Sequence, residues 1–452
     1  MLMNGSNNSP RWSINLTPAQ VLTLGFAGVI FAGSLLLMIP QSTAAGKVTH
    51  YVDALFTATS AVCVTGLVVV DTGSHWSLLG QVVTILLIQI GGLGIMTMST
   101  LFALLIGKRI SLRERLIIQE ATGLSRMGGL VRLTRAILLV TLATEGIGAV
   151  ILAIRFASDM SPVKAVYFGV YHAVSAFCNA GFDLFGVSLV TYVGDFTVNL
   201  AITSLIIIGG IGFTVITDLH ENGLGRKGRL SLHTRTALKV TASLIVFGTA
   251  LLYLFEYSNP DTLQPLPAHA RLFAAYFHAV TPRTAGFNTL PVGKMTIPGL
   301  LITLILMFIG ASPGGTGGGI KTTTFATILA TVKSILEGKQ DVEYGDKRLA
   351  RDIVDRSLAI TILSLGLVIL TTILLTITEK RLLVEVLFET TSAFGTVGLS
   401  MGITPNLTTA GKVFIMMTMF AGRVGPLTLG MALAQRIHAA PVRLPEDRLL
   451  VG

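Results

Sequence analysis

Four short segments of the chain repeat one pattern, in which a serine or threonine is followed five or six positions later by a glycine. An aromatic residue lies nine or ten positions before each of these glycines, and successive glycines are 105 to 115 positions apart. Self-similarity at such a spacing indicates an internal repeat of one structural unit. We call these segments the signatures, and they are residues 60–67, 175–182, 281–287 and 392–399.

The signatures are suited to binding a small cation through their main chain. A cation can leave water inside a membrane if backbone carbonyl oxygens replace its hydration shell. Glycine permits backbone conformations closed to other residues and lets the chain approach an ion closely. No ring of acidic side chains recurs at the signatures, which argues against a filter for divalent cations. The predicted ion-binding backbone belongs to Val64, Thr65, Gly66, Asn179, Ala180, Gly181, Thr284, Ala285, Gly286, Thr396, Val397 and Gly398.

A simpler alternative is that these glycines only let helices pack closely, as small residues often do in membranes. Scattered packing glycines would not recur four times in matched context, so we favour the cation filter.

The composition indicates a membrane protein. Of the 452 residues, 52% are hydrophobic and 12% are charged, whereas soluble domains carry about 25% charged residues. The net charge of +10 could suggest a nucleic-acid partner. However, the basic residues lie in short loops beside long apolar stretches, which is typical of membrane proteins, and we expect no nucleic acid. The two cysteines cannot form a disulfide framework, and we expect both thiols to be buried and reduced.

Eight apolar stretches are long enough to cross a bilayer, for which a helix needs about 20 residues. One precedes and one follows each signature. Shorter apolar stretches just before the signatures, such as residues 54–61 and 384–393, suit helices that enter the membrane and turn back. Non-helical backbone at membrane depth survives only in a wet cavity or buried in protein, so the signatures should meet at a shared aqueous axis. The predicted spans are 21–39, 78–106, 133–156, 198–216, 236–257, 297–328, 353–378 and 413–433.

The predicted fold is therefore all-α and integral to the membrane. It has eight transmembrane helices in four helix–pore loop–helix repeats, with four-fold pseudo-symmetry about one central pore. Lys and Arg concentrate in the linkers between the repeats and in the C-terminal tail, which places the linkers and both termini in the cytoplasm. The expected divisions are a cytoplasmic N-terminal segment (1–17), four pore repeats (18–107, 108–220, 221–331 and 332–434, the last three with their preceding linkers) and a cytoplasmic tail (435–452).

A glycine-rich run at residues 310–322 interrupts the seventh span. It differs from a phosphate-binding P-loop, which needs glycine directly before lysine, because Ile320 separates Gly319 from Lys321. Glycine costs about 1 kcal/mol and proline about 3 kcal/mol in a helix interior, so the run predicts a mobile loop at membrane depth, just below the signatures. The other inner spans also carry glycine clusters, which begin 24 to 28 residues after each signature glycine and predict hinges or close-packing points.

Three basic residues lie near the predicted pore. Arg423 is inside the eighth span, where an arginine costs at least about 2.5–3.5 kcal/mol and usually faces a cavity. It either has a functional role or is a structural partner for a carbonyl or acidic group. Lys321 lies nearer the cytoplasmic end and could extend its ammonium group to the interface. Arg283 lies within the third signature, and we expect it to brace that segment from behind, since a cation pointing into a cation filter would oppose its function.

The four signatures, the glycine-rich run and Arg423 together resemble the Trk/Ktr/HKT superfamily of potassium transporters, and most of all its Ktr-type membrane subunits. The resemblance implies filter glycines at Gly66, Gly181, Gly286 and Gly398. Serine at the first position accompanies sodium permeation in the family, so Gly66 implies potassium as the transported ion. The resemblance also implies an intramembrane gating loop, with Arg423 placed against it as an electrostatic obstacle to cations. The gating residues so implied are Gly310, Ala311, Ser312, Pro313, Gly314, Gly315, Thr316, Gly317, Gly318, Gly319, Lys321 and Arg423.

The resemblance also implies the partners. Ktr-type subunits pair as homodimers in the plasma membrane of prokaryotes and sit on a cytosolic ring of nucleotide-binding RCK-type regulatory subunits (KtrA-like). We therefore expect uptake of K⁺ across the lipid bilayer under control of that ring, with a role for Na⁺ left open and no organic cofactor in this chain.

Two other classes of function were weighed. A coupled secondary transporter of a different cation or small solute would commonly show inverted repeats, whereas four parallel units with re-entrant segments fit that class poorly. An enzyme would need converging catalytic groups at depth, and the spans offer only Glu145 and Asp218, outside any recognisable motif. We therefore expect no enzymatic activity.

Overall fold

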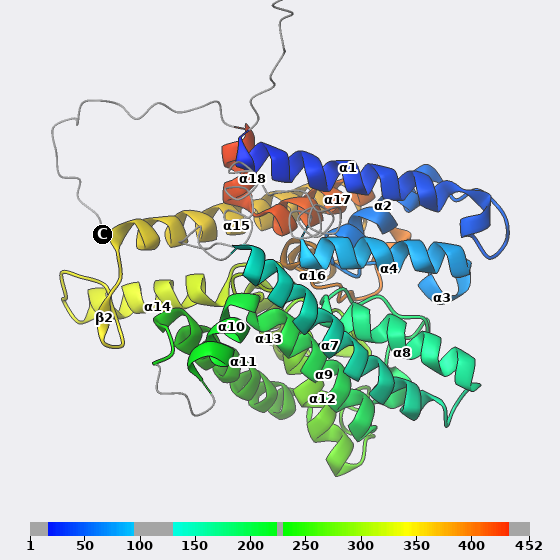
Figure 1. Ribbon diagram of the computed structural model, residues 1–452, viewed down its shortest axis with the longest axis horizontal. Coiled ribbons are helices and arrows are strands. Elements are labelled where there is room, and N and C mark those ends of the chain that lie inside the picture. The colour runs from blue at the N-terminus through cyan, green and yellow to red at the C-terminus, as the bar shows by residue number, and fades with distance from the viewer. Residues whose placement is uncertain (1–16, 95–129, 224–228, 434–452) are drawn as a thin grey trace, which may run out of the picture.

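The computed structural model describes residues 17–94, 130–223 and 229–433, and helices make up most of that part of the chain (Figure 1). The basic linker residues between 95 and 129 and between 224 and 228, and the two terminal segments up to residue 16 and from residue 434, lie outside the described residues. The orientation predicted from those cations therefore stays a prediction.

A long apolar helix precedes each signature. These outer helices are α1 (Pro18–Met38), α7 (Leu130–Phe156), α11 (Leu232–Glu256) and α15 (Arg351–Thr378). All four are long and apolar enough to cross a membrane. The predicted ends at residues 39, 156, 257 and 378 agree with the observed ends within one residue, because an uninterrupted apolar run leaves little doubt about where a span stops.

A shorter helix leads into each signature, and its length is insufficient to cross a bilayer. These re-entrant helices are α2 (Tyr51–Val62), α8 (Pro162–Phe177), α12 (Ala268–Val280) and α16 (Leu383–Gly395). The aromatic residue of each repeat lies on them, and Phe56, Tyr171, Phe277 and Phe388 are all at most 1% exposed. The equivalent positions of the internal repeat therefore occupy equivalent, fully buried places.

An inner helix follows each signature, namely α4 (Leu78–Leu93), α9 (Phe196–Ile211), α13 (Ile297–Phe308) and α17 (Thr409–Val424). The inner helices are interrupted at the glycine clusters for which the sequence predicts hinges or close-packing points. The helix α9 bends by 89° into α10 (Phe213–Asn222), and α17 gives way to α18 (Pro426–Leu433). A glycine with a positive φ lies at each break, Gly212 at 101° and Gly425 at 93°, a conformation that glycine adopts readily. In the third unit, a loop at residues 309–321 separates α13 from α14 (Thr322–Leu336).

By length and composition, four of the described helices could cross a membrane, or five when the bent pair α9–α10 counts as one span. The other inner helices are shorter. Small elements connect the larger ones, namely η1 (Pro40–Ser42), α3 (Thr72–His75), η2 (Val190–Tyr192), η3 (Val292–Lys294) and η4 (Thr404–Asn406).

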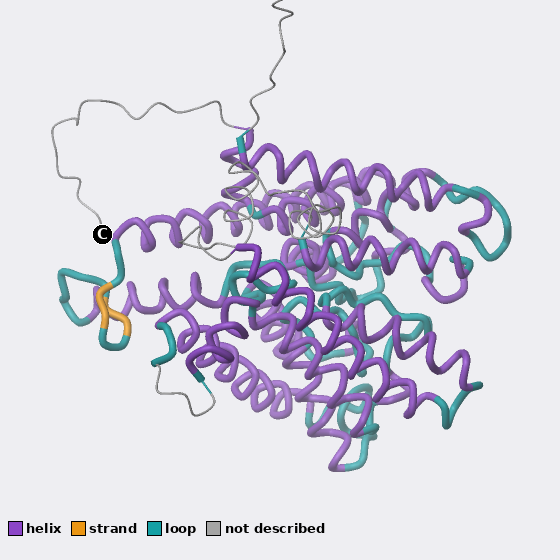
Figure 2. Tube along the Cα trace, viewed as in Figure 1, coloured by secondary structure: helices purple, strands orange, loops and turns teal. Residues whose placement is uncertain are grey.

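The helices α14 and α15 lie side by side and are joined at one end by a two-stranded antiparallel hairpin, β1 (Glu343–Tyr344) with β2 (Lys347–Arg348) (Figure 1). This hairpin is the one departure from the predicted all-α fold in the described residues. Figure 2 shows that much of the non-helical chain gathers in the middle of the molecule, with helices around it.

The outer and inner helices of each unit are fastened where the inner helix begins. In the third unit the carboxylate of Glu256 accepts hydrogen bonds from the backbone N–H and hydroxyl of Thr296, at 2.8 and 2.6 Å. In the fourth unit Glu379 accepts the same pair from Thr408, at 3.2 and 2.6 Å. The corresponding contacts in the first and second units are Ser77 with the carbonyl of Gln41 and Arg155 with Asp195. These joints hold the first turn of every inner helix.

Candidate functional site

The four signature glycines lie next to one another in a closed ring. A Cβ atom built on Gly66 would lie 3.2 Å from the Cα of Gly181, and one on Gly181 would lie 2.9 Å from the Cα of Gly286. A Cβ on Gly286 would lie 3.3 Å from the Cα of Gly398, and one on Gly398 would lie 3.0 Å from the Cα of Gly66, which closes the circle. The signatures therefore meet as the sequence predicted, and glycine is required because a side chain would run into the neighbouring main chain.

Carbonyl oxygens line the same ring. Next to the missing Cβ of each glycine lies the carbonyl oxygen of the residue that precedes the next glycine in the circle. For Gly181 this is the oxygen of Ala285 at 2.7 Å, and for Gly286 it is the oxygen of Val397 at 2.5 Å. The two remaining oxygens belong to Ala180 and Thr65. Uncharged oxygens in a ring are the groups that can replace the water around a monovalent cation.

The backbone takes the same unusual path in all four signatures. The residue two positions before each glycine has a positive φ: 57° at Val64, 59° at Asn179, 78° at Thr284 and 49° at Thr396. Positive φ is a genuine outlier for a β-branched residue and costs roughly 1–2 kcal/mol. Such strain persists only where the surroundings impose it, and it is typical of functional sites. Its occurrence in four copies indicates that each turn is held in one conformation.

The hydroxyl residue at the start of each signature fastens its turn. The backbone N–H of Gly66 donates to Ser60 Oγ at 3.0 Å, and that of Gly398 donates to Ser392 Oγ at 3.1 Å. In the other two signatures the hydroxyl donates instead, from Ser175 to the Phe182 carbonyl at 2.8 Å and from Thr281 to the Phe287 carbonyl at 2.5 Å. The serine or threonine of the repeat is therefore a support for the glycine turn.

The glycine-rich loop at residues 309–321 packs directly against the ring. Its backbone is tied to the second unit, because Ser312 N–H donates to the Gly210 carbonyl at 2.9 Å and Thr316 N–H donates to the Gly209 carbonyl at 3.1 Å. The Thr316 hydroxyl also donates to the carbonyl of Phe177, at the end of α8, at 3.1 Å. The loop is thus a folded segment with specific partners beside the signatures. Its mobility and its depth in the membrane stay predictions.

Arg423 connects this loop to the first unit. Its guanidinium donates to the carbonyl oxygens of Thr316 in the loop and of Gly91 and Gly92 in α4, the last at 3.3 Å. Among the sequence alternatives, a partner for carbonyl groups is the one observed. Because α17 carries the arginine, this side chain joins three parts of the chain that are far apart in sequence.

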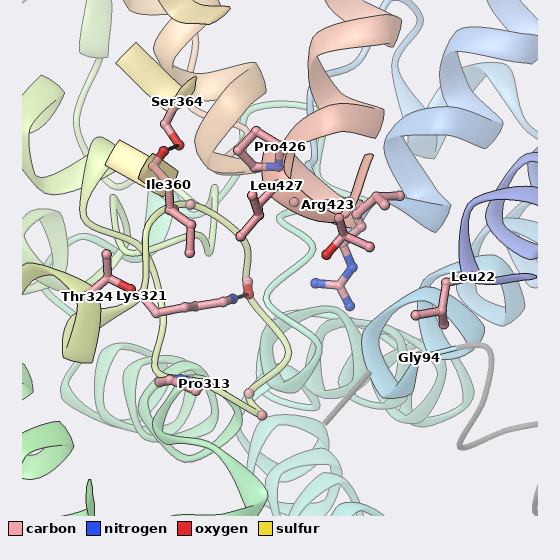
Figure 3. Close-up of a pocket in the computed structure, with 18 of the residues that line it drawn as sticks. Leu22, Gly94, Pro313, Lys321, Thr324, Ile360, Ser364, Arg423, Pro426 and Leu427 are labelled. Atoms are coloured by element: carbon pink, nitrogen blue, oxygen red, sulfur yellow. Dashed lines mark hydrogen bonds between the residues drawn. The ribbon is translucent and has the colours of Figure 1, made fainter. Parts of the chain in front are cut away.

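Lys321 and Arg423 both line a cavity of about 340 Å³ on the far side of the loop from the ring. Figure 3 shows the two side chains entering this cavity from opposite sides, with Pro313 and Thr324 also on its wall. The ammonium group of Lys321 turns back to donate to the Gly317 carbonyl at 2.6 Å. The ammonium group therefore holds the loop.

Two further polar residues near the signatures, Arg283 and His172, have structural partners. Arg283 points away from the ring and donates to the hydroxyl of Thr241 in α11 at 3.2 Å. His172 Nδ1 lies 2.7 Å from the Phe168 carbonyl. Among the described residues, no group of three or more His, Cys, Asp or Glu side chains could hold a metal ion. Cys63 and Cys178 are free and buried, as predicted.

Sequence reasoning missed three contacts of this site. It did not find the bond between Asn179 and Thr284, at 3.2 Å, or the bond from Gly318 N–H to Thr396 Oγ1, at 3.1 Å. Nor did it find the joints between outer and inner helices. The recurrence of a polar residue two positions before three of the glycines was the one available signal for the first two.

The chain is similar to known cation transport proteins. Residues 17–439 match the family model described as "TrkH: Cation transport protein". The chain is 45% identical over 442 residues to the Ktr system potassium uptake protein B of Bacillus subtilis, covering 98% of each chain. It is 40% identical to the protein of the same name from Vibrio alginolyticus, covering 96% of this chain and 94% of that one. It is 39% identical to the potassium/sodium uptake protein NtpJ of Enterococcus hirae, covering 97% and 98%.

Among solved structures, the potassium transporter TrkH of Vibrio parahaemolyticus superimposes with a TM-score of 0.73. The match covers 94% of this chain and 87% of that one at 18% sequence identity. At this identity the likeness concerns the fold alone.

Proposed function

The chain belongs to the TrkH family of cation transport proteins, and from this premise we propose that it carries potassium ions into the cell through the ring of signature turns. The observation that carries the proposal is the closed circle of Gly66, Gly181, Gly286 and Gly398, with a carbonyl oxygen beside each glycine. The similarity to two potassium uptake proteins extends over nearly the full length of the chain.

In this proposal the four units surround one pore with four-fold pseudo-symmetry. Each outer helix spans the membrane, each re-entrant helix enters it from outside, and each inner helix returns to the cytoplasm, which makes eight spans. The backbone groups from Val64 to Gly66 and their counterparts in the other signatures bind the dehydrated ion. Support comes from the matching φ values and from the hydroxyl supports that recur in every turn.

The loop at residues 309–321 is the gate. The loop packs against the turns at Thr284 and Thr396, and in this proposal a passing ion has to displace it. Arg423 and Lys321 hold the loop by hydrogen bonds to Thr316 and Gly317. The positive charges of these two side chains face the cavity behind the loop and oppose the entry of a cation. Unit charges a few ångströms apart repel strongly in a low-dielectric interior.

Control comes from outside this chain. We propose that the protein works as a homodimer in the plasma membrane of a prokaryote, with both termini in the cytoplasm and a cytosolic ring of RCK-type subunits below it. When those subunits move on binding nucleotide, they would pull α14 and the β1–β2 hairpin, which follow the loop directly in the chain. Support for this arrangement comes from the Ktr-type relatives.

The decisive experiment is potassium flux into vesicles that contain the purified protein, with and without a ring partner, together with rescue of growth at low potassium in a strain that lacks its own uptake systems. We expect K⁺ to pass down its gradient without any other ion. Uptake of K⁺ that requires a Na⁺ gradient, in either direction, would instead indicate that the two ions are coupled. This outcome is tested because one relative is a potassium/sodium uptake protein. Absence of K⁺ flux under every condition would overturn the proposal.

A further inference from the structure

The side chains two positions before the signature glycines differ from unit to unit, although their backbone conformation is shared. Asn179, Thr284 and Thr396 are polar and fully buried, and the fourth position is Val64. A buried polar group needs a hydrogen-bond partner, so the partners of these three side chains show what this layer of the site does.

Thr396 bonds directly to the gating loop. The backbone N–H of Gly318 donates to Thr396 Oγ1 at 3.1 Å. The fit is close, because a Cβ atom on Gly318 would lie 3.0 Å from Thr396 Cγ2 and 3.1 Å from the Gly395 carbonyl oxygen. The loop thus touches the strained turn of the fourth signature itself.

Thr284 meets the preceding residue of the loop, Gly317. A Cβ atom on Gly317 would run into Thr284 Oγ1 and lie 2.9 Å from Thr284 Cβ. The Thr284 hydroxyl is in turn hydrogen bonded to the amide of Asn179 at 3.2 Å. In the amide orientation that satisfies every partner, the Asn179 nitrogen donates to the carbonyls of Ala176 and Ile206 and its oxygen accepts from Thr284. Signatures two and three are therefore linked at the surface on which Gly317 rests.

We propose that Thr396, supported by the Asn179–Thr284 pair, is a latch that couples the filter to the gate; this rests on the proposed function and adds its regulation. When the loop moves away, the hydrogen bond from Gly318 N–H to Thr396 Oγ1 breaks. The backbone of Thr396, with its strained φ of 49°, then loses one of its restraints. Coupling between two sites is reciprocal. Ion occupancy that steadies the turn therefore favours the latched loop, and release of the loop loosens the turn.

The chain itself offers the right substitution. Val64 occupies the matched place in the first signature with a φ of 57°, so valine tolerates this conformation. Thr396→Val removes the hydroxyl and keeps both the shape and the β-branch, whereas Thr396→Ser keeps the hydroxyl. A matched control is Thr391→Val, because Thr391 lies on the same helix and its hydroxyl donates only to Leu387, one turn back, at 2.8 Å.

The test is potassium flux in vesicles without any ring partner. Loss of one hydrogen bond that holds the closed loop should raise the basal flux of Thr396→Val about three- to tenfold. Thr396→Ser should raise flux far less than Thr396→Val because it keeps the hydroxyl, and Thr391→Val should match the unaltered protein. Thr284→Val should also raise flux, and it decides the question if Thr396→Val does not fold.

A second measurement follows the loop directly. Pro313→Cys places a thiol on the cavity wall, and both native cysteines are buried. In detergent, maleimide labelling of this thiol should quicken by a similar factor when Thr396→Val is added and not when Thr396→Ser is added. Equal flux and equal labelling for the valine and serine variants would overturn the latch. A lack of potassium flux in the unaltered protein would instead overturn the proposed function.

Discussion

The ring of signature turns and the loop at residues 309–321 are in contact, yet they are built by opposite means. The ring consists of four copies of one strained backbone turn, packed so closely that its glycines have no room for a Cβ atom. The loop occurs once in the described part of the chain, and separate hydrogen bonds hold it to the second unit, the fourth unit and Arg423. The ring is rigid because each turn is packed tightly against the next. The loop can move once its separate hydrogen bonds are broken.

Under the proposed function, the difference predicts two main tasks for the two regions. Changes at the ring glycines should alter mainly which ion passes, and changes in the loop should alter mainly how much passes, with Thr396 as the contact between them. A loop variant that changed selectivity more than flux would break that separation.

Shortening the loop should have the largest effect. Deletion of residues 314–319 removes Thr316 and its bonds to Gly209, Phe177 and Arg423. At about 0.5–1.5 kcal/mol for each hydrogen bond, we expect basal potassium flux to rise about ten- to a hundredfold. The ratio of sodium to potassium permeability should change much less in vesicle assays, because the lost bond from Gly318 to Thr396 restrains one of the four turns. Unaltered flux would place the gate elsewhere.

Arg423→Ala should come next. The guanidinium bridges the carbonyls of Thr316, Gly91 and Gly92, and hydrogen bonds to charged groups contribute about 1.5–3 kcal/mol. We expect basal flux to rise about tenfold with selectivity intact. The basal flux of Arg423→Lys should lie between those of the unaltered protein and of Arg423→Ala, because an ammonium group cannot bridge both sets of carbonyls as a planar guanidinium does. A lysine variant equal to the alanine variant would show that geometry matters more than charge.

Gly66→Ser should act on selectivity. A Cβ atom there would contact the Ala180 carbonyl oxygen and lie 3.2 Å from the Cα of Gly181, and the φ of 89° adds roughly 1–2 kcal/mol of strain for serine. We expect the sodium-to-potassium permeability ratio to rise about three- to tenfold while total potassium flux falls. Gly28→Ser is the control, since nothing lies within 4 Å of its Cβ position. An unchanged ratio would count against the carbonyl ring.

Ser392→Ala should give the smallest change. It leaves the N–H of Gly398 without its acceptor, at a cost of about 1–3 kcal/mol that the neighbouring turns share. We expect the permeability ratio to shift about threefold or less, with basal flux nearly unchanged. Ser392→Thr should behave as the unaltered protein, because Thr281 takes the same place in the third signature. Equal ratios in the alanine and threonine variants would show that this hydroxyl does not support the filter.

The repeated parts of the molecule were predictable from sequence, and the unrepeated contacts were not. Four matched segments predict that Gly66, Gly181, Gly286 and Gly398 lie at equivalent places, and the outer helices follow from long apolar runs. Arg423 was noticed as a charge in a span, but its partners lie 332 and 107 residues away. Residue type alone cannot identify such distant carbonyl partners.

The same holds for local conformation. Nothing in a single valine or threonine indicates a positive φ, because the strain at Val64 and Thr396 is imposed by the assembled ring. The bend at Gly212 was signalled by its glycine cluster, but its size of 89° depends on the loop that packs there.

The carboxylates of Glu256 and Glu379 have a mechanical consequence for the whole protein. They anchor the first turns of α13 and α17 to their neighbours. In α4, α9 and α17 the glycine break comes after 16 residues, about 24 Å further along at 1.5 Å per residue. A helix that is held at its first turn can move mainly at its other end. In the proposed orientation, a force applied from the cytosol moves mainly the segments around the breaks. Throughput could then be adjusted over a wide range with little change in the preference among ions.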